Sequence, residues 1–288
     1  MVKKGLFIGI VTLDFVYLSG KLPSNNEKIA ASDYTVSAGG PATNAAVTFG
    51  YLGNQAEILG VVGTHPITQL IGSDLGNYRV SITDLAPDYT EPPPVSSIII
   101  TEATGERAVI SINATKIQAS TEQMPANIYT GVDLVMIDGH QMALSIAYAP
   151  LAQKNNIPVI IDGGSWKPGF EKVLPFVDYA VCSANFYPPG CSNSEEVFTY
   201  LQELGIPHIA ITQGEKHIQY FSLGVSGKLP VPQVEVVDTL GAGDVFHGAF
   251  CHYILQQKFT ESLVAAAEIA SYSCKFFGTR RWMEFQNK

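Results

Sequence analysis

The chain has 288 residues, of which 46% are hydrophobic and 15% are charged, and this balance is typical of an ordered globular protein. The formal net charge of −9 argues against a protein that binds nucleic acid or an anionic membrane through clustered positive charge. No apolar run approaches the length of a membrane span, so we expect no membrane partner.

Short apolar segments alternate with helical segments along most of the chain. Fully apolar strands that alternate with helices are typical of a mostly parallel sheet covered on both faces, so the pattern predicts an open α/β sandwich. The expected strands are 6–11, 56–62, 134–137, 159–161, 179–182 and 209–212, and the expected helices are 41–52, 67–78, 142–154, 194–204, 245–255 and 261–276.

Two segments, 15–36 and 94–113, interrupt this alternation. In the second, β-rich runs at 97–101 and 109–112 flank a turn at 104–106, which predicts a β-hairpin. Together the two segments are expected to form a small antiparallel sheet that stands off the main core. Such a sheet has unpaired edges and one exposed face, so it is expected to pack against a substrate, a partner subunit or both.

The start of the chain imitates a secretion signal only faintly, because Asp14 interrupts the first apolar run and no small-x-small cleavage site follows. The cysteines are widely spaced without a C-x-x-C pair, so we expect reduced thiols in a cytoplasmic protein. The histidines show no metal-binding spacing, and no metal cage made of side chains is predicted. The cysteines are Cys182, Cys191, Cys251 and Cys274.

The most informative motif is Asp238-Thr239-Leu240-Gly241-Ala242-Gly243-Asp244, which follows an apolar run at 234–237 and opens a predicted helix. Its small residues let the backbone approach an anion, and the first-turn N–H groups and the helix dipole attract that anion. The carboxylate of Asp244 is placed to accept a proton from a hydroxyl that attacks a phosphoryl group. A Gly-Ala-Gly alone is more often only a tight loop, but the flanking acids favour phosphoryl transfer to an alcohol.

This motif resembles the C-terminal signature of the ribokinase-like (PfkB) carbohydrate kinases, and Ala38-Gly39-Gly40-Pro41-Ala42-Thr43-Asn44-Ala45-Ala46 resembles their N-terminal signature. The two motifs lie about two hundred residues apart, each in a strand–loop–helix setting, so the resemblance covers essentially the whole chain. Residues 236–249 look closest to ketohexokinase-like and sulfofructose kinase-like members. The resemblance implies one domain over 1–288, a three-layer αβα sandwich with a mostly parallel central sheet and a small β-sheet lid formed by about 15–36 and 94–113.

The resemblance also implies an activity, the phosphorylation of a small sugar by ATP. Asp244 would be the catalytic base and would contact the sugar, and the amides of Gly241, Ala242 and Gly243 would form the anion hole. Mg²⁺ would arrive with the nucleotide, held mainly by phosphates and water and by no protein side chain directly. Family members often dimerise through the lid, so a homodimer is expected.

Other positions match the two ligand sites of the family. The sugar site would contain Asp14, Gly39, Gly40, Asn44 and His140 in addition to Asp244. The ATP site would contain Asn185, Thr212 and Gly214, together with Gly241 and Gly243, and the stretch 271–278 is a candidate wall for the adenine. Each of these residues also has an ordinary structural interpretation, such as a helix start for Asn44 or a strand end for Asp14.

Three features depart from the pattern of the family. The N-x-x-E motif lacks its acid, because Pro188 follows Asn185 at the position of the Glu. His140 stands where the ketohexokinase-like and sulfofructose kinase-like members carry an Arg near the sugar, which argues against a strongly anionic substrate. Basic residues are sparse in the lid, where Arg107 and Lys28 are the main candidates.

We therefore expect a cytoplasmic kinase of a neutral ketose or pentose. A nucleoside kinase of the same fold is the nearest alternative, and the sequence does not distinguish the two. A sugar-binding protein with little turnover is a second alternative, supported by the missing acid after Asn185. An NAD oxidoreductase is disfavoured, because no G-x-G-x-x-G follows the first strand.

Overall fold

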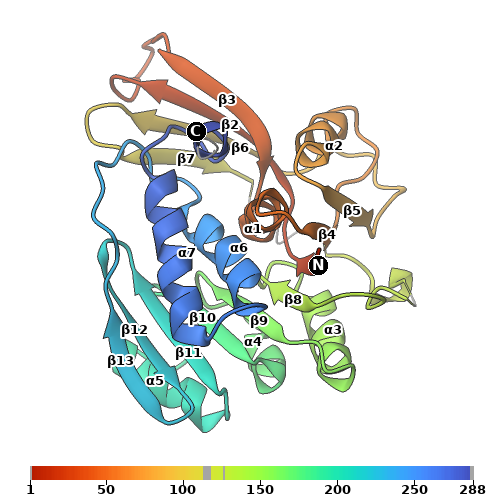
Figure 1. Ribbon diagram of the computed structural model, residues 1–288. Coiled ribbons are helices and arrows are strands. Elements are labelled where there is room, and N and C mark those ends of the chain that lie inside the picture. Colours follow the sequence, from red (N-terminus) through yellow and green to blue (C-terminus); the bar gives the residue numbers. More distant parts are fainter. Residues whose placement is uncertain (1, 113–117, 126, 286–288) are drawn as a thin grey trace.

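A nine-stranded sheet runs through the computed structural model, which describes residues 2–112, 118–125 and 127–285 (Figure 1). Its strand order is β13-β12-β11-β10-β9-β8-β1-β4-β5. Seven neighbouring strands are parallel, namely β1 (Lys4–Ile8), β4 (Gln55–Gly60), β5 (Val80–Asp84), β8 (Leu134–Ile137), β9 (Val159–Gly163), β10 (Tyr179–Ser183) and β11 (His208–Gln213). Strands β12 (Lys216–Ser222) and β13 (Val225–Leu229) add an antiparallel edge. The prediction of a mostly parallel sheet is confirmed.

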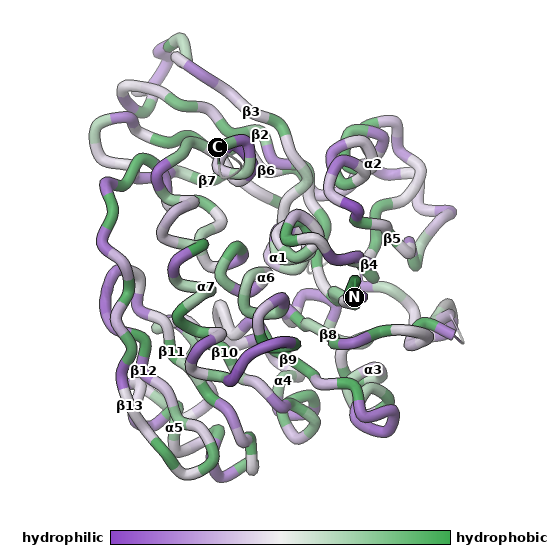
Figure 2. Tube along the Cα trace, viewed as in Figure 1, coloured by the Kyte–Doolittle hydropathy of each residue, from purple (hydrophilic) through white to green (hydrophobic). Residues whose placement is uncertain are grey.

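Helices cover both faces of this sheet. Each buried strand sends alternate side chains to opposite faces, so Phe7 of β1 packs in one core, and Leu6 and Ile8 pack in the other. The first face carries α1 (Pro41–Tyr51), α2 (Thr68–Gly76), α6 (Ala242–Ile254), α7 (Phe259–Ser273) and α8 (Trp282–Phe285). The second face carries α3 (Met142–Lys154), α4 (Phe170–Val173) and α5 (Ser194–Glu203). Figure 2 shows most of the hydrophilic segments on the outer loops. The predicted three layers are confirmed.

A second, four-stranded sheet stands at the carboxyl end of the main strands (Figure 1), with the order β3-β2-β6-β7. Its strands are β2 (Thr12–Ser19), β3 (Asp33–Gly39), β6 (Val95–Thr101) and β7 (Arg107–Ser111). The predicted hairpin is confirmed as β6 and β7, and residue 113 of the predicted lid lies outside the described residues. The expectation of a wholly antiparallel sheet is wrong. Strands β2 and β6 are parallel, because each belongs to a separate excursion of the chain from the main sheet.

The apolar run before the central motif is not a strand. Residues 234–237 belong to no strand, with a bend at Val237, and Val236 is 51% exposed. The backbone N–H groups of Val237 and Asp238 donate instead to the carbonyl of Cys274 at the end of α7 (2.8 and 3.1 Å). Helix α6 then begins at Ala242, earlier than the 245 expected from the sequence. The central motif is therefore positioned by α7 and not by a preceding strand.

Asp138 joins the end of β8 to the segments that surround the site. Its fully buried carboxylate accepts hydrogen bonds from the backbone N–H groups of Ile10 (3.1 Å), Ala42 (3.2 Å) and His140 (2.8 Å). Burial alone would raise the pKa of Asp138, but the charge of His140 and the hydrogen bond from its backbone N–H hold it below its usual value. An ionised Asp138 thus fixes the β1–β2 connection against the start of α1. None of the helices in the described ranges has the length and apolar character that a membrane crossing requires.

Candidate active site

The first turn of α6 presents free backbone donors. Gly241 precedes the helix with a left-handed φ of 72°, and a Cβ there would lie 2.8 Å from Thr279 Cγ2, so glycine suits both the turn and the close approach. The Ala242 N–H donates to the Thr239 carbonyl at 3.3 Å. Across the described part of the chain, no acceptor contacts the N–H groups of Gly243 or Asp244. Gly243 is exposed, and a Cβ added to it would meet nothing within 4 Å. This turn can therefore accept an anion.

Asp244 places a carboxylate directly beside these donors. It is half-buried, and its Oδ2 accepts a hydrogen bond of 2.8 Å from Asn44 Nδ2 of α1. Burial raises the pKa of Asp244 to about 7, and repulsion by Asp162 adds to the shift. The hydrogen bond from Asn44 and the charge of His247 oppose it. A carboxylate with a pKa near neutrality is suited to accept and return a proton.

Asp162 and His247, which the sequence analysis did not identify, lie beneath Asp244. His247 Nδ1 is 2.7 Å from the Gly243 carbonyl oxygen, and its Nε2 is 3.1 Å from the Val181 carbonyl oxygen. The same Nε2 is 3.7 Å from Asp162 Oδ1. Both ring nitrogens of His247 therefore face acceptor oxygens, which fixes the ring against the backbone of α6 and of β10. The only sequence signal for Asp162 was an acid followed by two glycines at the end of a predicted strand.

Asp14 lies on β2, within the small sheet and not at the end of the first strand as the sequence analysis placed it. It is 8% exposed, and its Oδ1 accepts a hydrogen bond from Thr12 Oγ1 (2.8 Å). Burial raises the pKa of Asp14, against the hydrogen bonds from Thr12 and Ser96 and the charge of Arg280. A Cβ on Gly39 would lie 1.9 Å from Asp14 Oδ2. The close packing against Asp14 is therefore a sufficient structural reason for glycine at this position.

Gly40 and Asn44 both have structural roles at the start of α1. Gly40 has a φ of 100°, and a Cβ there would lie 2.4 Å from the Ile10 carbonyl oxygen. The Asn44 side chain uses both of its ends, because Nδ2 donates to Asp244 and Oδ1 accepts from Arg280 Nη1 at 2.9 Å. Arg280 was not identified from the sequence. Its nearest signal was a Thr279-Arg280-Arg281 run directly after a glycine.

His140 connects to the site through Asp138. Its ring is half-buried, with Nδ1 3.2 Å from Asp138 Oδ1. That distance suits an ion pair, although the orientation of the ring is poor for a hydrogen bond. Because the backbone N–H of Ala42 donates to the same carboxylate group, Asp138 holds the predicted sugar-site segments at 39–44 and 140 together.

Asn185, Thr212 and Gly214 lie together at the ends of β10 and β11, and among the described residues no hydrogen bond or ion pair joins them to Asp244. Ser183 pairs with Thr212 in the sheet, and Ser183 Oγ accepts a hydrogen bond from the Asn185 N–H (3.1 Å). Gly214 forms the β11–β12 turn with a φ of 62°. In the described ranges, no group of three His, Cys, Asp or Glu side chains could hold a metal ion.

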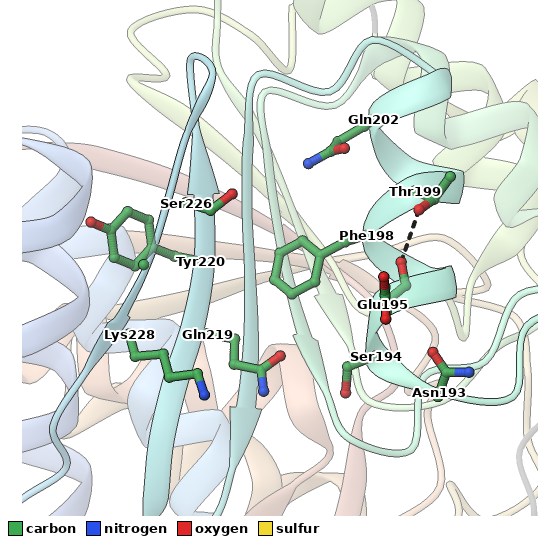
Figure 3. Close-up of a pocket in the computed structure, with 11 residues that line it drawn as sticks. Asn193, Ser194, Glu195, Phe198, Thr199, Gln202, Gln219, Tyr220, Ser226 and Lys228 are labelled. Atoms are coloured by element: carbon green, nitrogen blue, oxygen red, sulfur yellow. Dashed lines mark hydrogen bonds between the residues drawn. The ribbon is translucent and has the colours of Figure 1, made fainter.

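A cavity of about 790 Å³ lies elsewhere, between α5 and the β12–β13 edge (Figure 3). Phe198, Gln219 and Lys228 are among its lining residues, and none of the predicted site residues is. One hydrogen bond links the cavity wall to the end of β11, where Ser194 Oγ accepts from Gln213 Nε2 (3.4 Å). We therefore locate the candidate site by its polar groups and not by this cavity.

Comparisons with known proteins match the chain over nearly its full length. Residues 3–284 match the model of the pfkB family carbohydrate kinases. Ribokinase from Lactococcus lactis is 25% identical over 96% of this chain and 92% of its own length, and ribokinase from Bacillus subtilis is 25% identical over 98% and 96%. The structure of Arabidopsis thaliana ribokinase complexed with ribose and ATP aligns with a TM-score of 0.75 at 21% identity, over 99% of this chain and 100% of that chain. Closeness to ketohexokinase-like or sulfofructose kinase-like members stays a prediction.

We expect the carboxyl group of Asp244 to titrate near pH 7, and carbon-13 NMR of the side-chain carboxyls measures this directly. In Asp162→Asn the midpoint should fall, because loss of a neighbouring negative charge favours the ionised form. Circular dichroism should show that this variant is folded. A wild-type midpoint near 4, or a midpoint that Asp162→Asn does not move, would contradict this electrostatic account.

Proposed function

The chain belongs to the pfkB family of carbohydrate kinases, which are phosphotransferases that act on sugars, and we propose that it transfers the γ-phosphoryl group of ATP to a hydroxyl of a small neutral sugar. The observation that carries this proposal is the position of the Asp244 carboxylate beside the free first-turn amides of α6. Phosphoryl transfer rewards such an arrangement, because it needs charge stabilisation and a proton acceptor at one point.

In this proposal the start of α6 provides both functions. The amides of the Gly241, Ala242 and Gly243 segment form the anion hole, and those of Gly243 and Asp244 are the free donors. Asp244 is the catalytic base that accepts the proton of the sugar hydroxyl. Its pKa of about 7 leaves a substantial ionised fraction at neutral pH and keeps the base strong enough to take that proton.

The sugar is proposed to lie between the small sheet and α1, in contact with Asp14, Gly39, Gly40, Asn44 and His140. The buried carboxylates of Asp14, Asp138 and Asp162 would repel an anionic substrate. They therefore support a neutral ketose or pentose. Arg280 does not offset this, because Asn44 and other protein groups already occupy its terminal nitrogens. The small sheet is proposed to act as a lid that excludes water from the reaction.

ATP is proposed to bind along Asn185, Thr212 and Gly214 toward the Gly241–Gly243 segment. When bound with the nucleotide, Mg²⁺ would neutralise the charge on the phosphates. Pro188 occupies the position of the family's acid after Asn185, so water and phosphate oxygens would supply its ligands. We place the enzyme in the cytoplasm, where ATP and reduced thiols occur together.

A homodimer through the small sheet forms part of the proposal. The outward face of this sheet carries large apolar side chains in the exposed positions Tyr34 (67%), Ile110 (76%) and Ile112 (67%). Tyr34 and Ile110 lie on one face, because Tyr34 pairs with Tyr17 and Ile110 pairs with Ser97, next to Phe15, and Ile112 directly follows β7. An exposed apolar patch on an open sheet is typical of a contact surface.

A coupled ADP-release assay over ribose, fructose, tagatose, sulfofructose and adenosine tests the proposed activity. We expect turnover with one of the neutral sugars. Asp244→Asn keeps an acceptor oxygen for Asn44, so it should fold and bind ligand while its rate falls by about 10²–10⁴. Turnover with adenosine alone would establish a nucleoside kinase, and sugar binding without turnover would establish a binding protein. Equal rates in the two proteins would exclude Asp244 as the base.

Gly243→Ala tests the anion hole without disturbing the fold. The added Cβ meets no protein atom within 4 Å, and replacing a helical glycine stabilises by up to about 1 kcal/mol, so thermal unfolding should occur at the same or a higher temperature. The rate of phosphoryl transfer should nevertheless fall, because the methyl group enters the space reserved for the phosphoryl group. Ser226→Ala, on the remote β13 edge, is the matched control. Full activity in Gly243→Ala would place the phosphoryl group elsewhere.

Ile110→Asp tests the dimer interface. The substitution puts a charge on the exposed face of β7, so a dimer that buries this face should dissociate, with the mass halved in light scattering. Leu223→Asp is the control, because Leu223 is equally exposed (74%) but lies between β12 and β13. A wild-type protein that is monomeric at high concentration, or a dimer that Ile110→Asp leaves intact, would rule out this interface.

A further inference from the structure

We propose that Arg280 is a positioning residue for Asp244 and acts through the side-chain amide of Asn44, an inference that rests on the proposed role of Asp244. Arg280 Nη1 donates to Asn44 Oδ1 at 2.9 Å, and Asn44 Nδ2 donates to Asp244 Oδ2 at 2.8 Å. The three residues come from the C-terminal segment, α1 and α6, and form one continuous chain of hydrogen bonds.

The chemistry of the groups fixes the direction of this chain. A guanidinium has donors and no acceptor, so only the oxygen of the Asn44 amide can face Arg280. The amide nitrogen must then face Asp244, where it needs an acceptor oxygen. Without Arg280, the amide is free to rotate and to present its oxygen to Asp244, which an ionised carboxylate would repel. Arg280 thereby selects the amide orientation that supports the ionised acid.

Arg280 can perform this task because it is itself held firmly. Its Nη2 donates to the Ala38 carbonyl at the end of β3 (2.7 Å) and to Asp74 Oδ2 of α2 (3.1 Å). The Ala38 N–H donates to the same Asp74 oxygen at 2.9 Å. The guanidinium also lies 5.7 Å from the centre of the Tyr78 ring. With its side chain 10% exposed and paired to an acid, Arg280 is a fixed charge and not a mobile ligand contact.

The hydrogen bond from Asn44 should have a measurable effect on Asp244. A donor directed at the ionised form favours that form, and it opposes the burial and the repulsion by Asp162 that raise the pKa of Asp244. It also restricts the rotation of the carboxylate, which must meet a sugar hydroxyl and the transferred phosphoryl group in line. Loss of Arg280 should therefore raise the pKa of Asp244, lower its ionised fraction at neutral pH and misplace its carboxylate while leaving the nucleotide contacts untouched.

Arg280→Gln tests the inference, with Arg281→Gln as the matched control. Arg281 is the adjacent arginine and pairs with Asp33 at 2.8 Å on the edge of the small sheet, with its side chain 41% exposed. In Arg280→Gln we expect kcat to fall about 10–100-fold with little change in the KM for ATP. The acid limb of the pH profile of kcat/KM and the NMR midpoint of Asp244 should both move to higher pH. Arg281→Gln should resemble the wild type in all four measurements.

A double-mutant cycle with Asn44→Ala distinguishes positioning from general stabilisation. If Arg280 acts through Asn44, then Arg280→Gln should produce no further shift of the Asp244 midpoint in the Asn44→Ala background. A shift that persists there, or a folded Arg280→Gln with unchanged kcat and midpoint, overturns the inference. If Arg280→Gln does not fold, Arg280→Lys replaces it in the same cycle, because lysine keeps the charge beside Asp74 but lacks the fork that reaches Asn44.

The experiments distinguish a failure of the inference about Arg280 from a failure of the proposed function. If Asp244→Asn is fully active, the base role fails, whereas the NMR midpoint of Asp244 still tests the link to Arg280. If Asp244→Asn is inactive and Arg280→Gln leaves both kcat and the midpoint unchanged, the inference about Arg280 alone fails.

Discussion

The burial of carboxylates at the carboxyl end of the sheet is the constraint on which the site depends. Asp138 and Asp162 lie there close enough to Asp244 to raise its pKa, Asp14 lies on the adjoining small sheet, and each of the four loses hydration on burial. An ionised carboxylate is costly to bury unless hydrogen bonds or an opposite charge compensate. The fold compensates each acid in a different way. As a result, acids of one chemical type acquire different proton affinities.

The hydrogen-bond and charge partners of each acid determine whether it stabilises the structure or is suited to proton transfer. Asp138 accepts hydrogen bonds from three backbone N–H groups, and its pKa is lowered. It therefore stays ionised and holds together the chain segments that donate to it. Asp244 receives one side-chain amide and faces another acid, and its pKa is raised to about 7. Neighbouring carboxyls whose proton affinities are driven apart are typical of acid–base sites. The free amides of α6 lie beside the acid whose pKa is close to neutrality.

Sequence patterns predicted the parts of the molecule that depend on local chemistry. Apolar runs predicted six of the seven parallel strands, all but β5, and the small-residue motif predicted the turn before α6. Strand β13 was missed because three of its five residues are exposed and it contains no apolar run. The strand implied before the central motif is absent, because pairing with a sheet neighbour cannot be seen locally. Arg280 was missed for a similar reason. It lies 236 residues from Asn44, and only the tertiary fold brings the two together.

The contacts of Arg280 also connect the small sheet to the acid. One guanidinium bonds the carbonyl of Ala38, at the root of β3, and the amide of Asn44, which holds Asp244. Ala38 pairs with Leu13, the residue before Asp14 on β2. Arg280 is therefore linked to both acids that are proposed to contact the sugar, to Asp14 through β3 and β2 and to Asp244 through Asn44. A displacement of the root of the small sheet would therefore reach Asp244 through three hydrogen bonds, which join Ala38 to Arg280, Arg280 to Asn44 and Asn44 to Asp244. The contacts of Arg280 therefore tie the position of the small sheet to the position of the Asp244 carboxylate at the start of α6.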